Sequence, residues 1–291
     1  MVNTPMILTG MGVYFLFIVF VGVWYSKRAN KNPENYFLGG RSLGPWVSAL
    51  SAEASDMSGW LLMGLPGVAY FTGSGEAFWT AMGLAIGTLI NWQIVSKRLR
   101  VYSETANNAI TLPSFFSNRY HDKVKILSII AALLLIVFFS IYASSQFVAF
   151  GKLFEYVIGS NQYYTQMVLI GAAIVFIYTL LGGFLGESFC DLIQALLMIG
   201  SILLVFVFAA VREGGFAQVI ANLQNYPRFL DVFGIATPTL QDGVQQVANG
   251  APLFGPGKDY GFLNIVSCMA WGLGYFGMPQ VLLRFMAIKK A

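Results

Sequence analysis

Residues 51–60 read SAEASDMSGW and lie inside an apolar run from residue 46 to residue 67. A helix of about 20 apolar residues is long enough to cross a bilayer. Asp56 falls near the middle of the run, where a charged aspartate would cost on the order of 2.5 to 3.5 kcal/mol even on lenient insertion scales. A carboxylate at that depth faces a cavity, a partner or an ion rather than lipid. The sequence therefore predicts a binding site inside a membrane-spanning segment.

The composition extends this interpretation to the whole chain. Hydrophobic residues make up 57% of the 291 residues and charged residues only 10%, against about 25% charged in ordinary soluble domains. The apolar runs are continuous and lack the alternation of membrane strands, so the predicted fold is an all-α membrane protein. Runs of about 17 to 25 residues predict about seven transmembrane helices, at residues 7–25, 46–67, 77–96, 126–151, 164–181, 188–210 and 260–283.

The basic residues predict the orientation, because cytoplasmic loops carry the excess of lysine and arginine. They lie between the apolar runs, so the net charge of +4 does not indicate a nucleic-acid partner. The excess predicts an amino terminus outside and a chain end inside the cell membrane. One side holds Lys27, Arg28, Lys31, Arg41, Lys97, Arg98, Arg100, Arg119, Lys123, Lys125, Arg284, Lys289 and Lys290, and the other holds Lys152, Arg212, Arg228 and Lys258.

The second run carries a polar face. Ser48, Ser51, Ser55 and Ser58 recur at spacings of three and four residues, which stacks their hydroxyls on one side of a helix. Close helix packing through small residues is one interpretation of this face. The other is an ion site, in which an unwound backbone exposes carbonyl oxygens as hard ligands for a small cation such as sodium.

The seventh run contains a second interruption, WGLGYFGMPQ at residues 271–280. Trp271, Tyr275 and Pro279 are four residues apart, so they lie on one face that could cover an apolar side chain. Anchoring at the membrane interface is the alternative for Trp271. The run also spells G-x-G-x-x-G, but no strand precedes it, so a dinucleotide site is not predicted.

Other polar residues inside the apolar runs leave alternatives open. In the fourth run, Tyr142 and Gln146 either face a cavity or pack against other helices. Asp191, near the start of the sixth run, either lines an exit path or lies at interface depth. Gly83 and Gly87 form a G-x-x-x-G pair that predicts close helix packing.

Residues 212–258 predict an external loop with a short helix near 216–223, and this loop is interpreted as a lid or as a covering. His121 lies among charged residues of another connection and is interpreted as a solvated histidine. The chain lacks a Ser-His-Asp set and a phosphate-binding loop, so an enzyme is not predicted.

Three segments resemble the proline-transporting branch of the sodium:solute symporter family. They are SALSAEASDMSGWLLMGLPG at 48–67, NWQIVSKRLRVYSETANNAITLPSFFSNRY at 91–120 and WGLGYFGMPQVLLRFMA at 271–287. The resemblance implies a thirteen-helix transporter with a five-plus-five inverted repeat of the leucine-transporter type. On this basis residues 1–291 are one incomplete transmembrane domain, with a first helix at 7–25, a first repeat at 46–210 and the start of a second repeat at 260–283.

The resemblance also implies site residues. Sodium would be bound by backbone oxygens, with a carboxylate and small polar residues around it, and proline would be bound by aromatic residues and a proline. No cofactor is implied beyond sodium as coupling ion. The sodium or coupling residues are Ala54 and Met57 through their backbone oxygens, with Ser55, Asp56, Ser58, Gly59 and Asp191. The proline-binding residues are Trp60, Tyr142, Trp271, Tyr275 and Pro279.

The function expected from this resemblance is sodium-driven uptake of L-proline across the lipid bilayer. A related transporter of another amino acid or an osmolyte is the first alternative, and a membrane partner without transport of its own is the second. Glu53 departs from the small or uncharged residue expected at its position. Because the family also uses hydroxyls of a ninth helix, the chain is expected to be the amino-terminal part of a longer transporter.

Overall fold

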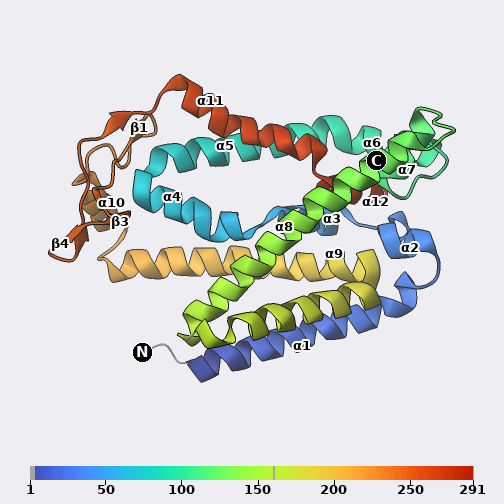
Figure 1. Ribbon diagram of the computed structural model, residues 1–291, viewed down its shortest axis with the longest axis horizontal. Coiled ribbons are helices and arrows are strands. Elements are labelled where there is room, and N and C mark those ends of the chain that lie inside the picture. The colour runs from blue at the N-terminus through green and yellow to red at the C-terminus, as the bar shows by residue number, and fades with distance from the viewer. Residues whose placement is uncertain (1–3, 160, 291) are drawn as a thin grey trace. The chain divides into compact units, whose positions relative to one another are not determined.

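The computed structural model describes residues 4–159 and 161–290, and helices form most of the chain (Figure 1). The helices are α1 (Thr4–Ala29), α2 (Pro33–Leu38), α3 (Pro45–Asp56), α4 (Leu65–Thr72), α5 (Ser74–Asn91), α6 (Lys97–Thr105), α7 (Leu112–Arg119), α8 (Ile126–Ile158), α9 (Tyr164–Arg212), α10 (Phe216–Gln224), α11 (Phe262–Ala270) and α12 (Pro279–Ala287). Shorter 3-10 or π-helical turns cover Gly39–Arg41, Trp60–Gly64, Trp92–Ser96, Asn161–Tyr163 and Trp271–Gly277.

Within the described residues, four helices are long and apolar enough to cross a membrane, or five if a bent pair counts as one span. The four cover Pro5–Ala29, Ser74–Thr105, Ile126–Ile158 and Tyr164–Arg212, and the bent pair joins Phe262–Gly277 to Pro279–Ala287 at 48°. This count is lower than the seven predicted runs for two reasons. The second run is divided into α3 and α4, and the fifth and sixth runs lie together in α9.

The long helix α9 is broken at one glycine. Gly183 has φ 53° and ψ −161°, a conformation outside the helical region that residues with a side chain rarely adopt. The chain reverses there, and the two parts of α9 match the predicted fifth and sixth runs (Figure 1). The predicted connection near this glycine is therefore a single-residue turn.

By its internal contacts the chain divides into two units, each of which is described separately. Unit 1 comprises residues 1–59, 94–196 and 279–291, and unit 2 comprises residues 60–93 and 197–278. In unit 1, α1 packs against α9. Ile18 and Val21 form a buried cluster with Cys190, and Gly22 lies against the backbone of Tyr178.

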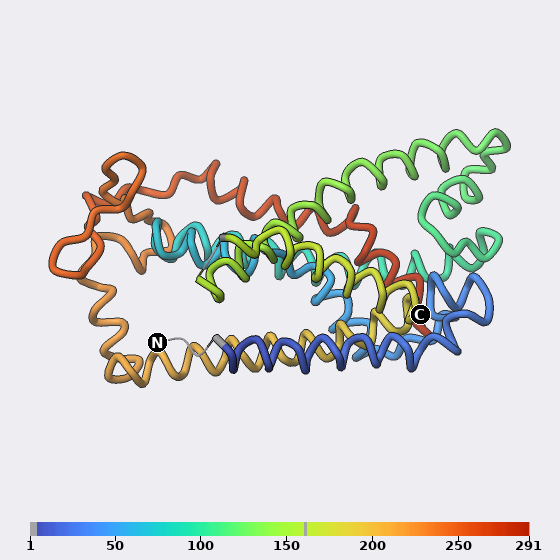
Figure 2. Tube along the Cα trace, turned by 60° about the horizontal axis from the view of Figure 1, so that its bottom comes forward, coloured from blue at the N-terminus to red at the C-terminus, as the bar shows by residue number. Residues whose placement is uncertain are grey.

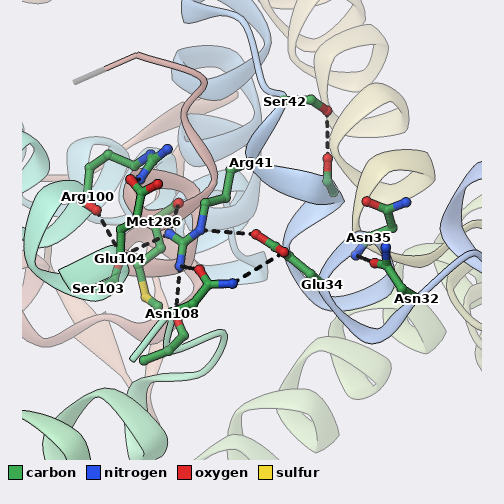
Figure 3. A network of polar contacts seen from close by, with 12 residues as sticks. Asn32, Glu34, Asn35, Arg41, Ser42, Arg100, Ser103, Glu104, Asn108 and Met286 are labelled. Carbon is green, nitrogen blue, oxygen red and sulfur yellow. Dashed lines mark hydrogen bonds and ion pairs between the residues drawn. The ribbon is translucent and has the colours of Figure 1, made fainter. Parts of the chain in front are cut away.

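An arginine outside the spans joins three segments of unit 1 (Figure 3). The Arg41 guanidinium donates to Ser103 Oγ at 2.9 Å, to the Met286 carbonyl at 2.8 Å and to Asn108 Oδ1 at 2.9 Å, and it pairs with Glu34 at 3.3 Å. Burial and the nearby charge of Arg100 lower the pKa of Arg41. Its contacts hold the connection after α1 against the end of α6 and the end of α12.

The loop between α9 and α11 lies in unit 2 beside the turn from α4 to α5 (Figure 2). The predicted short helix is confirmed as α10. The sequence did not predict the strands that follow, which pair antiparallel as β1 with β6, β2 with β3 and β4 with β5. The Ser74 amide donates to the Phe229 carbonyl at 2.7 Å, and Trp79 donates to the Val232 carbonyl at 2.7 Å. The strands are β1 (Gly234–Ile235), β2 (Leu240–Gln241), β3 (Val244–Gln245), β4 (Val247–Ala248), β5 (Ala251–Pro252) and β6 (Lys258–Asp259).

The predicted packing role of the G-x-x-x-G pair is confirmed in unit 2. A Cβ atom on Gly83 would lie 2.5 Å from Met269 Cα, and one on Gly87 would lie 2.5 Å from Gly272 Cα. Both distances are shorter than a carbon–carbon contact allows. The absence of side chains on these two residues therefore lets α5 approach the backbone of α11 and of the turn that follows it, and we call these four residues the glycine contact.

Candidate functional site

The polar stretch in the second run interrupts a helix, in agreement with the unwound backbone of the second interpretation given for its polar face. Helix α3 ends at Asp56, and its C-cap Met57 has φ −63° and ψ 118°, an extended conformation. Ser58 is also outside the helix, and a π-helical turn begins at Trp60. The last carbonyls of a helix have no partner inside the helix, so the break leaves backbone oxygens of the last turn of α3, including that of Ala54, at a helix end of negative polarity.

A side chain of α8 binds the backbone at this break. The Gly59 amide donates to Gln146 Oε1 at 2.9 Å. Of the two interpretations given for these polar residues, packing against another segment therefore holds for Gln146. Tyr142 is half-buried and lies one helical turn before Gln146, on the same face of α8.

The serine face of α3 contacts α9 and α12 in unit 1. Ser51 Oγ donates to Asp191 Oδ2 at 2.7 Å, and Ser55 Oγ lies 3.3 Å from the same oxygen. Ser48 Oγ donates to the Arg284 carbonyl at 3.4 Å. These three serines therefore serve helix packing through hydrogen bonds rather than through small size alone, Ser51 and Ser55 to a buried carboxylate and Ser48 to a backbone carbonyl.

Arg284 is the centre of this group. Its guanidinium donates through Nη2 to Asp191 Oδ2 at 2.9 Å and to Glu187 Oε1 at 3.1 Å, and through Nε to Ser51 Oγ at 3.0 Å. Arg284 is 2% exposed and Asp191 is 8% exposed. We call Arg284, Asp191, Glu187, Ser51 and Ser55 the arginine cluster.

The sequence counted Arg284 among basic residues that follow the seventh helix, whereas the structure buries it inside α12. The predicted seventh run ends at residue 283 because arginine ends an apolar run. Glu187 was missed altogether. Its signal was present, since Glu187 and Asp191 are four residues apart and two carboxylates one turn apart in an apolar run need a shared cation.

Glu53, the other carboxylate of residues 51–60, is not buried as Asp191 is. Its side chain is exposed, and among the described residues no hydrogen bond or ion pair to its carboxylate is present. It does not belong to the arginine cluster.

Two tryptophans of the predicted solute site meet in unit 2. The ring centroids of Trp60 and Trp271 are 4.3 Å apart with the planes at 41°. Tyr275 is buried, and its carbonyl accepts a hydrogen bond from Asn91 Nδ2 at 2.8 Å. Trp271 and Tyr275 lie in the 3-10 turn Trp271–Gly277, and Pro279 begins α12 in unit 1. The regular spacing of one α-helical face predicted for these three residues is therefore wrong, because the backbone is not α-helical between Trp271 and Pro279.

Long apolar helices, two of them interrupted, with a buried cluster of charge beside one interruption, define a multi-pass membrane protein. A family model described as the sodium:solute symporter family matches residues 36–291. The chain belongs to this family.

Curated relatives give the same result. The chain is 43% identical over 286 residues to a sodium/proline symporter of Salmonella typhimurium and to one of Escherichia coli, covering 98% of the chain and 51% of each relative. It is also 43% identical over 279 residues to a sodium/proline symporter of Staphylococcus aureus, covering 96% of the chain and 49% of the relative. The chain therefore spans about half the length of the curated relatives it matches.

Proposed function

We propose that this protein takes part in sodium-coupled uptake of L-proline across the cell membrane, with its amino terminus outside. The interruption of α3 at Met57 and Ser58 is the observation that carries this proposal. Sodium is a hard cation that binds oxygen ligands, and a helix end at membrane depth supplies carbonyl oxygens and the negative pole of the helix dipole. The similarity to proteins named sodium/proline symporters supports the choice of ion and solute.

The proposed sodium residues lie in unit 1. Ala54 and Met57 offer backbone oxygens, and the carboxylate of Asp56 adds negative charge at the same helix end. Ser55, Ser58 and Gly59 form the edges of the interruption. Asp191 is proposed as a second carboxylate on the route of the ion, because it already accepts hydrogen bonds from Ser51 and Ser55 of α3.

The proposed proline residues are treated unit by unit. In unit 2, the paired rings of Trp60 and Trp271 offer an aromatic surface for the apolar pyrrolidine ring, and Tyr275 is held by Asn91. In unit 1, Tyr142 and Pro279 are proposed to contact the solute. These assignments rest on the match of motif residues to the family.

Coupling follows if sodium stabilises the conformation that binds proline. By thermodynamic reciprocity, proline then tightens sodium binding by the same factor. The residues at the interruption would carry this coupling, because a change at the end of α3 alters both the oxygens of the last turn and the start of the segment that contains Trp60.

The test is uptake of labelled proline by the complete gene product that contains this chain, as a function of sodium. We expect Asp56→Asn to raise the sodium concentration for half-maximal uptake by about tenfold or more, since a charge-assisted contact contributes roughly 1.5–3 kcal/mol. Glu53→Gln removes a carboxylate three residues earlier and serves as the matched control. Normal sodium dependence in Asp56→Asn would contradict the proposed role of Asp56.

The solute is tested separately. Unlabelled amino acids and osmolytes are added in excess to the same uptake assay, and L-proline should compete best. Stronger competition by another solute would keep the sodium site and replace proline. Absence of any sodium-dependent uptake in the complete gene product would favour a membrane partner without transport.

A further inference from the structure

An open cavity lies in unit 1 between α6, α7 and the turn that leads into α8. Its volume is about 580 Å³, which is large enough for a polar headgroup. The site proposed above does not use any of its residues. The lining residues are Tyr102, Thr105, Ala106, Asn107, Ser117, Asn118, Arg119, His121, Asp122 and Lys123.

The charge balance of this cavity favours an anion. Arg119 and Lys123 line it, and neither forms an ion pair with another residue in the described part of the chain. His121 adds a ring nitrogen that can donate a hydrogen bond. The one carboxylate in the lining, Asp122, is already engaged, because its Oδ2 accepts from the Leu127 amide at the start of α8 at 2.7 Å.

The backbone fixes the positions of these groups. The His121 amide donates to the Asn118 carbonyl at 3.3 Å, and the Asp122 amide donates to the Ser117 carbonyl at 2.9 Å. The Arg119 guanidinium lies over the ring of Tyr102, 4.7 Å from its centroid. This contact orients the planar guanidinium without using its hydrogen-bond donors, which remain able to bind two oxygens of one phosphate.

The apolar residues next to the cavity indicate the depth at which it lies. Val124 is 72% exposed and Ile126 is 54% exposed, directly after Lys123. Ile126 begins the 33-residue apolar helix α8, whose outer face continues with exposed Ile129 and Ile130. A basic cavity at the start of such a helix lies at the level of lipid headgroups, on the side of the membrane where lysine and arginine are in excess.

We propose that this cavity binds the phosphate headgroup of an anionic phospholipid. Arg119 would bind two phosphate oxygens through its guanidinium, Lys123 would add a second cation, and the acyl chains would extend along the exposed start of α8. A phospholipid is favoured over soluble phosphate as the ligand, because the exposed apolar residue Val124 directly follows Lys123. The inference does not depend on proline transport.

The test is native mass spectrometry of the purified complete gene product, with phosphatidylglycerol titrated against phosphatidylcholine. We compare wild type with Arg119→Gln/Lys123→Gln. The matched control is Lys27→Gln/Arg28→Gln, which removes the same charge from exposed positions at the end of α1. Inorganic phosphate at millimolar concentration is the competing soluble probe.

We expect the cavity variant to lose phosphatidylglycerol affinity by roughly 10- to 30-fold, since each of the two cations near a charged membrane surface contributes roughly fivefold. The control variant should bind like wild type. Equal loss in both variants would overturn the proposal, because the binding would then follow overall charge. Displacement of the lipid by phosphate alone would overturn the lipid assignment in favour of a soluble anion. Circular dichroism of each variant tests whether folding is unchanged. If the double Gln variant unfolds, Arg119→Lys/Lys123→Arg is used instead. That variant keeps both charges and should bind phosphatidylglycerol.

Discussion

The arginine cluster of unit 1 and the glycine contact of unit 2 bring helices together in opposite ways. The arginine cluster joins α3, α9 and α12 through side chains, with Arg284 bonded to two carboxylates and a hydroxyl. The glycine contact brings α5 against α11 and the following turn through backbone alone. A donor in a cluster of hydrogen bonds can exchange one acceptor for another, whereas two closely packed backbones have no alternative arrangement of the same kind.

The difference indicates which region would be able to change in the proposed transport cycle. A cation that binds near Asp191 would compete with Arg284 for the same carboxylate, and Glu187 could then keep Arg284 paired. The glycine contact offers no such exchange. Substitutions should therefore separate the two regions, since those in the arginine cluster should affect both stability and sodium dependence and those in the glycine contact should affect stability only.

The largest effect is expected for Arg284→Gln. This change leaves two carboxylates beside each other without their cation, and loss of one partner from a buried ion pair costs about 3–5 kcal/mol. The free energy of unfolding, measured by denaturant titration in lipid-detergent micelles, should fall by this order. Arg228→Gln is the matched control, because Arg228 also pairs with two carboxylates, Asp231 and Asp259, but is exposed. Equal losses would show that burial of the arginine cluster does not matter.

The next effect is expected for Gly87→Ala. A methyl group at this position would meet Gly272 at 2.5 Å, so the helices must separate, at a cost of about 1–3 kcal/mol. The same unfolding measurement applies, and the sodium dependence of the remaining uptake should be unchanged. Gly67→Ala is the control, since no atom lies within 4 Å of its added methyl group. A shifted sodium dependence in Gly87→Ala would remove the distinction between the two regions.

A smaller difference is expected between the two carboxylates that hold Arg284. Asp191→Asn should raise the sodium concentration for half-maximal uptake by roughly tenfold, since it removes a charged acceptor that serves three donors. Glu187→Gln should change it by less than about threefold, because its side chain is 34% exposed and its carboxylate accepts from Arg284 Nη2 alone among the described residues. The reverse order would assign the ion route to Glu187.

The smallest effect concerns Arg228, the exposed counterpart of Arg284, in the loop between α9 and α11. The Phe233 amide and the Arg228 guanidinium lower the pKa of Asp231. A lowered folded pKa contributes stability above the unfolded value of about 3.9, and this contribution is lost as the pH falls through the folded value. We expect Arg228→Gln to raise the pKa of Asp231 in a carboxyl NMR titration, whereas Lys258→Gln, which removes a charge without touching Asp231, should leave it nearly unchanged.

Part of the fold and site was predictable because the signals are local. Hydropathy located the apolar runs, the polar stretch located the interruption of α3, and Gly83 and Gly87 indicated close packing. The division of the seventh run was also indicated, but its 3-10 turn was not, since glycine-rich sequence specifies a weak helix without specifying its pitch. The sodium and proline residues stay predictions.

The sequence by itself determined that the chain crosses a membrane and that a polar stretch interrupts the apolar run of its second helix, because the cost of polar groups in hydrocarbon is a property of each segment alone. Only the tertiary structure decided that Arg284 is a buried partner of Asp191, 93 residues away, and that Glu187 shares it. An arginine after an apolar run is as consistent with a loop as with a buried ion pair. Which of the two it becomes depends on the carboxylates that folding brings beside it.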